Sequence, residues 1–84
     1  MARRSQVEYY IDQLNKRLGL QPQSKGEFVL GSCKPDRVRL YELERRSHQD
    51  SNCFTTIVSG LYISEMYQFV KGLTEGLEIA QLNK

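Results

Sequence analysis

Four arginines and one tyrosine are the side chains whose types and spacing best suit recognition chemistry. Arg37, Arg39 and Tyr41 alternate in the stretch RVRLY, and Arg45 and Arg46 follow four residues later. In a strand, alternate residues lie on one face. Guanidinium groups beside an aromatic ring suit phosphate contact and base stacking, so this surface could bind nucleic acid. Long charged side chains are also the ordinary means of keeping an outer sheet face soluble, and that interpretation stays open.

Metal binding is the next chemistry to consider, because Cys33, His48 and Cys53 are residue types that hold zinc. Structural zinc sites usually take four ligands with close pairs such as C-x-x-C, and neither cysteine has such a neighbour. We therefore expect no metal and no cofactor. Both thiols are interpreted as small apolar groups that pack inside the fold.

The sequence also lacks a catalytic pattern. Nucleophilic catalysis needs a base held against the nucleophile, and the only histidine lies in the polar stretch RRSHQDSN. Glu42 and Glu44 share a strand face but flank Leu43 among arginines, as surface charges do. No glycine-rich phosphate loop is present. We expect a protein that is not an enzyme.

Length and composition restrict the protein class. The 84 residues, 39% hydrophobic and 26% charged, suffice for one domain over residues 1–84. No apolar run approaches the ~18 residues that span a bilayer. The N-terminal stretch is amphipathic, unlike a secretory signal. With only two cysteines, these features predict a cytoplasmic protein without membrane contact. The net charge of +2 is far below that of dedicated nucleic-acid binders.

Two amphipathic helices flank the strands. In the first, Ser5 and Glu8 form a capping-box pattern, Gly19 suits the C-terminal cap, and Tyr9 falls on the exposed side. In the second, Ser64 is the expected N-cap. The predicted inward stripes are Val7, Tyr10, Ile11, Leu14 and Leu18 in the first helix, and Met66, Phe69, Val70, Leu73, Leu77 and Ala80 in the second.

Gly72 and Gly76 weaken the second helix by ~1 kcal/mol each relative to alanine. Both lie with Ile79 on one flank of its apolar stripe. The missing side chains would let another backbone approach closely. The first helix is the simpler candidate for that neighbour, and a partner protein is the alternative.

Three strands are predicted between the helices, in EFVLGSC, in residues 37–44 and in CFTTIVS. Short links join them, so the sheet should be antiparallel. The fold class is α+β: a two-layer α-β-β-β-α domain whose two helices pack on one face of a three-stranded antiparallel sheet. Val38 and Leu40 are expected to face one side, and Tyr41 and Leu43 to lie on the open side, rimmed by arginine.

Two resemblances bear on function. The element order is that of double-stranded RNA-binding domains, but their lysine cluster is missing from SEMYQFVK at the start of the second helix. The chain also resembles short uncharacterised bacteriophage and prophage proteins in LNKRLG, in YEL and in EMYQFVKGL. This likeness implies a phage gene context in a bacterial cell. Many small phage proteins bind a host protein or nucleic acid.

Together, these observations predict a small binding module that associates with a protein, either a second copy in a homodimer or a host partner. Nucleic-acid binding is the alternative. The candidate contact residues are Arg37, Arg39, Tyr41, Leu43, Arg45 and Arg46, and the candidate close-packing flank is Gly72, Gly76 and Ile79.

Overall fold

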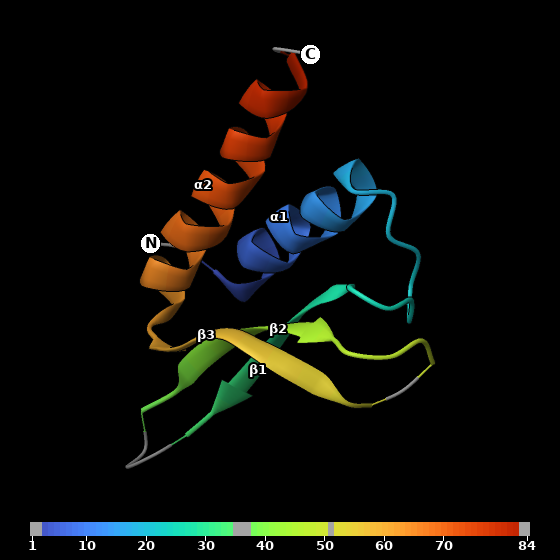
Figure 1. Cartoon of the computed structure of the whole chain (residues 1–84). Helices are drawn as coiled ribbons and strands as arrows, with labels where there is room; N and C mark the ends of the chain where they lie inside the picture. The colour runs from blue at the N-terminus through green and yellow to red at the C-terminus, as the bar shows by residue number, and fades with distance from the viewer. Residues whose placement is uncertain (1–2, 35–37, 51, 83–84) are drawn as a thin grey trace.

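A computed structural model describes residues 3–34, 38–50 and 52–82, and it has the predicted element order. The elements are α1 (Arg4–Arg17), β1 (Phe28–Cys33), β2 (Leu40–Arg46), β3 (Phe54–Leu61) and α2 (Ile63–Leu82). The strands form one antiparallel sheet in the order β1-β2-β3. Both helices lie on the same side of this sheet (Figure 1), which confirms the two-layer α+β prediction. No helix in the described ranges is long and apolar enough to cross a membrane.

The core lies between the two helices and the middle strand. Its buried cluster takes two residues from each of three elements: Val7 and Ile11, Tyr41 and Leu43, and Met66 and Val70. Full burial of one such side chain contributes about 1.5–3 kcal/mol. The core is small, so each of these six residues matters to stability.

The placement of Tyr41 and Leu43 corrects the predicted face of β2. Both were expected on the open side, yet their exposed fractions are 9% and 0%. Val38, expected to share a face with Leu40, precedes the strand and is exposed. Side chains alternate with a period of two, so an assignment that is wrong by one residue exchanges the two faces of the strand.

The cap residue of each helix lies two residues earlier than predicted, and a different side chain makes the capping hydrogen bond. The Arg3 N–H donates to Gln6 Oε1 at 2.8 Å, and the Tyr62 N–H donates to Glu65 Oε1 at 2.9 Å. In each case the side chain of the third helical residue accepts a hydrogen bond from the backbone N–H of the cap residue. Ser5 and Ser64 therefore lie inside the helices and are not the caps.

The end of α1 is as predicted. Gly19 has φ +71°, and its N–H donates to the Lys16 carbonyl at 3.1 Å. The Leu20 N–H donates to the Asn15 carbonyl at 2.9 Å, which completes a Schellman motif. Tyr9 is exposed as expected, but Leu18, the last residue of the predicted stripe, is exposed too.

The buried side of α2 is rotated from the predicted stripe. Met66, Val70 and Thr74 are buried, whereas Phe69 and Leu73 are partly exposed. The Thr74 hydroxyl donates to the Val70 carbonyl at 2.9 Å, so a threonine can occupy this interior position without an unsatisfied polar group. The inward side of α2 thus includes a polar residue that a search for apolar spacing passes over.

Candidate functional site

The predicted arginine surface does not form one continuous site. Arg37 lies outside the described residues, and Arg39 is exposed just before β2. Arg45 and Arg46 are consecutive at the end of β2, so their side chains leave opposite faces of the sheet. Tyr41 lies in the core. The described members of the candidate set are therefore divided between the two faces of β2, and Tyr41 and Leu43 are buried, so they do not form one exposed surface.

Arg45 and Arg46 are engaged within the chain. Arg45 Nε donates to the Gly26 carbonyl at 3.1 Å, and its guanidinium lies 4.6 Å from the centroid of the Phe28 ring. Arg46 forms an ion pair with Glu27 at 3.1 Å, in which the two side chains are only 10% and 18% exposed. Both arginines thus hold residues 26–27, immediately before β1, against the end of β2.

The open face of the sheet is acidic where an arginine-rimmed apolar patch was expected. Glu42 and Glu44 alternate there with the buried residues of β2 and flank the position of Gly31 on β1. A Cβ on Gly31 would overlap the Glu44 carboxylate. Burial, and to a smaller extent the charge of Glu42, raises the pKa of Glu44 above its ordinary value. Glu42 and Glu44 give this face negative charge, which does not favour contact with a phosphate backbone.

The two cysteines lie at opposite ends of β2, so Cys33 is far from Cys53 and from the segment that contains His48. Cys33 pairs with Leu40 at one end of β2, whereas the Cys53 carbonyl accepts from the Ser47 N–H beyond the other end. Both thiols are exposed, which corrects the expectation that they are buried. Within the described part of the chain, no group of three or more histidine, cysteine or acidic residues is placed to hold a metal ion.

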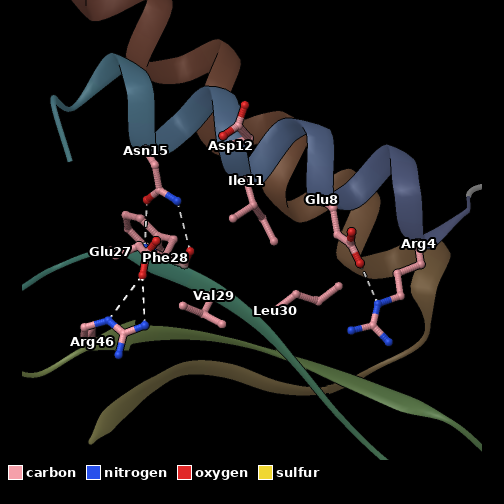
Figure 2. A pocket seen from close by; sticks show the side chains of 10 residues that line it. All are labelled: Arg4, Glu8, Ile11, Asp12, Asn15, Glu27, Phe28, Val29, Leu30 and Arg46. Carbon is pink, nitrogen blue, oxygen red and sulfur yellow. Dashed lines mark hydrogen bonds and ion pairs between the residues drawn. The ribbon is translucent and has the colours of Figure 1, made fainter. Parts of the chain in front are cut away.

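A groove of about 390 Å³ runs between α1 and β1 (Figure 2). Its lining is apolar where it meets the core and charged along the walls. The apolar lining is Ile11, Phe28, Val29 and Leu30, and the polar lining is Arg4, Glu8, Asp12, Asn15, Glu27 and Arg46. Sequence reasoning did not find this groove, because it depends on how α1 crosses β1.

The charged walls of this groove are made of ion pairs. Glu8 Oε1 lies 2.7 Å from Arg4 Nε, and Asp12 Oδ2 lies 3.0 Å from Lys16 Nζ. Glu27 is paired with Arg46, as described above. Each carboxylate of the groove thus has a cationic partner. The arrangement suits contact with a mixed polar and apolar ligand better than acid-base chemistry.

Asn15 joins the two sides of the groove. Its Oδ1 accepts from the Phe28 N–H at 2.8 Å, and its Nδ2 donates to the Phe28 carbonyl at 3.0 Å (Figure 2). The amide side chain therefore makes the two bonds that a neighbouring strand would make with this residue. The sequence analysis missed Asn15; a polar residue beside the inward Leu14 is the signal that could have indicated this contact.

A second surface lies on α2, on the side turned away from the core. We call it the outer face of α2 and define it as Phe69, Leu73 and Ile79 with Gly72 and Gly76 among them, together with Tyr62, which immediately precedes the helix. The four large side chains are 36%, 38%, 60% and 56% exposed, respectively. At helical spacing the five positions within α2 fall on one side of the helix, and Glu65 in its first turn falls on the same side.

The two glycines of this face are open to solvent, which corrects the prediction that they accommodate the first helix. A Cβ at Gly72 or Gly76 would meet nothing within 4 Å. Instead, α1 contacts α2 through the Tyr10 and Tyr67 rings, whose centroids are 5.6 Å apart, and through Gln81, which donates to the Arg17 carbonyl. The close-packing flank of α2 is left unoccupied by the described chain.

No family model, curated protein or solved structure matches this chain. The likeness to phage proteins stays a prediction.

Proposed function

We propose that this protein is a binding module without catalytic activity that associates with protein, and that its first partner is a second copy of the same chain. The observation that carries the proposal is the outer face of α2, where four large side chains are exposed and two glycines are uncovered. Large apolar side chains exposed on one side of a helix are typical of interaction sites.

The size of the face suits a weak dimer. If a fully exposed large side chain presents roughly 200 Å², the four exposed fractions together amount to about 400 Å² of mainly apolar surface. Interfaces are about 60% apolar, so the complete contact would bury roughly 650 Å² on each copy. That value lies at the lower end of the range for specific complexes.

The sequence of the face favours a second copy over an unrelated partner, because the face is complementary to itself. If two α2 helices pack antiparallel, with the point midway between Gly72 and Gly76 at the centre, each Gly72 lies opposite Gly76 of the other copy. In that register Phe69 lies opposite Ile79 of the other copy. Large side chains then fill both ends while the glycines allow close approach at the centre, as a two-fold interface requires.

A cytoplasmic setting in a bacterial host is part of the proposal. It is supported by the exposed thiols, Cys33 and Cys53, which such a compartment keeps reduced, and by the likeness to phage proteins. Nucleic-acid binding has less support, since Arg45 and Arg46 contact their own chain and the open sheet face carries Glu42 and Glu44.

Sedimentation equilibrium over a range of concentrations tests the dimer, with two matched variants. Ile79→Lys places a charge on the outer face of α2. Ile57→Lys makes the same change on β3, at a residue that is 46% exposed. We expect a micromolar dissociation constant for the unmodified chain, an increase of at least about tenfold for Ile79→Lys, and little change for Ile57→Lys. A chain that stays monomeric at millimolar concentration, or equal effects of the two variants, would refute the proposal.

A further inference from the structure

The two edges of the sheet differ in how they are protected against pairing with another strand. Along β3 the register with β2 shifts twice, and Gly60 has φ +73°. Such irregularities twist an edge and interrupt its hydrogen-bonding pattern. The register of β1 runs without a shift from Phe28 opposite Arg45 to Cys33 opposite Leu40. Its sequence, FVLGSC, contains no charged residue and no proline.

The backbone groups that β1 presents to this edge can be identified from the Asn15 contact. Because Asn15 binds the N–H and carbonyl of Phe28, those groups point away from β2. Outward and inward positions alternate along an antiparallel strand. Leu30 and Ser32 therefore also direct their N–H and carbonyl groups to the open edge. No described residue binds those groups.

The groove beside β1 has room for one extended chain. Its opposite wall is α1, and its volume of about 390 Å³ would hold a short peptide segment. At the Phe28 end, Asn15 already occupies the position of a neighbouring strand. An added strand would therefore run beside residues 29–33 and end at Asn15.

We infer that this edge binds an extended segment of a partner polypeptide as a fourth strand. The N–H and carbonyl groups of Leu30 and Ser32 form its backbone bonds, and an apolar side chain of the segment enters the groove over Ile11 and Leu30. A second copy of this chain is the poorer occupant. Pairing of two β1 strands would bring the α1 helix of each copy to the edge where the other α1 already lies.

A matched pair of substitutions at Ser32 isolates the backbone bonds. Ser32→Pro removes an N–H that has no hydrogen-bond partner among the described residues, whereas Ser32→Ala keeps that N–H. Proline is tolerated on an edge strand when its nitrogen faces outward, so both variants should fold. The Ile79→Lys change is included throughout, so that association through the outer face of α2 does not affect the readout.

The probe is a synthetic heptapeptide selected on Ser32→Ala from a random phage-displayed library. We expect its sequence to alternate apolar and polar residues. Fluorescence anisotropy of the labelled peptide should give similar affinities for the protein that keeps Ser32 and for Ser32→Ala. The peptide should bind Ser32→Pro about tenfold more weakly. In the protein that keeps Ser32, bound peptide should slow hydrogen exchange at the backbone amides of Leu30 and Ser32.

Three results would overturn the inference: a library that enriches no peptide, equal binding by Ser32→Pro and Ser32→Ala, or Leu30 and Ser32 amides that stay unprotected with peptide bound. A change of solution mass caused by Ser32→Pro would also overturn it, because the occupant of the edge would then be a second copy. Every variant in this experiment carries Ile79→Lys. A negative result would therefore refute peptide binding at β1 without bearing on the proposed dimer through α2.

Discussion

Replacement of Gly72 and Gly76 by alanine tests whether the outer face of α2 is uncovered in the monomer. Both residues lie well inside α2, which spans Ile63–Leu82. The added methyl groups would meet no atom within 4 Å, so they neither clash nor require a neighbour to move. The effect on the monomer should therefore be close to the intrinsic helix propensity of the two residue types.

The expected gain is large for so small a domain. Alanine is about 0.8–1.0 kcal/mol more favourable than glycine at a helix interior, so the double substitution should raise the free energy of unfolding by about 2 kcal/mol. Part of this gain reflects the lower conformational entropy of the unfolded chain. For a domain of this length, a change of 2 kcal/mol corresponds to a rise in Tm of roughly 10 °C.

The measurement is urea and thermal unfolding followed by circular dichroism, on Ile79→Lys protein so that only the monomer contributes. Gly60→Ala is the control, because it makes the same Gly→Ala change at a position where the backbone conformation disfavours an L side chain. A Cβ there also meets nothing within 4 Å, but the residue has φ +73°. An L side chain in that conformation is strained by about 1 kcal/mol, so Gly60→Ala should destabilise the fold.

If the double alanine variant is neutral or destabilised in the monomer, the outer face of α2 is not open and the reasoning from the glycines is wrong. On the chain that retains Ile79, the same variant should show a second effect of opposite sign. Four methyl groups would then separate the two α2 helices of the dimer, and the dissociation constant should rise by about tenfold or more. A variant more stable as a monomer and weaker as a dimer would support both claims.

Two further predictions concern charged groups. Arg46→Gln should lower the free energy of unfolding in urea by about 2–3 kcal/mol, because Glu27 loses its cation where both side chains are mostly buried. Arg4→Gln breaks a pair that is about half exposed and should cost less than about 0.5 kcal/mol; equal losses would contradict the burial argument. Burial raises the pKa of Glu44, so the folded state binds its proton more tightly than the unfolded state and loses stability as the pH rises through that pKa. Glu44→Gln should therefore stabilise the fold at pH 7, with a benefit that fades below about pH 4, where the wild-type carboxyl is protonated; a pH-independent difference would contradict this origin.

Element order and type followed from the sequence because they depend on local periodicity and turn residues. The face of β2 did not. The strand alternates evenly, so either Val38 and Leu40 or Tyr41 and Leu43 could have formed its buried face. The choice is made by distant residues: Leu30 on β1 and Val58 on β3 both lie opposite Leu43, which becomes fully buried.

The inward side of α2 was ambiguous for a related reason. Apolar residues occupy much more than half of its circumference, so spacing alone does not say which part faces the core. Phe69 and Leu73 fit the predicted stripe as well as Met66 and Val70 do. The roles of Arg45 and Arg46 were also beyond local reasoning, since the groups that engage them lie about 19 residues away in sequence.

The flat shape of the molecule explains why its apolar surface is divided between a core and an outer face. Its principal extents are 45 × 31 × 18 Å, and the helices cover only one side of the sheet. Two copies could in principle stack their open sheet faces, but that contact would bring Glu42 and Glu44 of each copy close to those of the other copy. Like charges in such a contact oppose association. Self-association is thereby directed away from the sheet face and toward the outer face of α2, where Glu65 lies near one end and Gly72 and Gly76 occupy the centre.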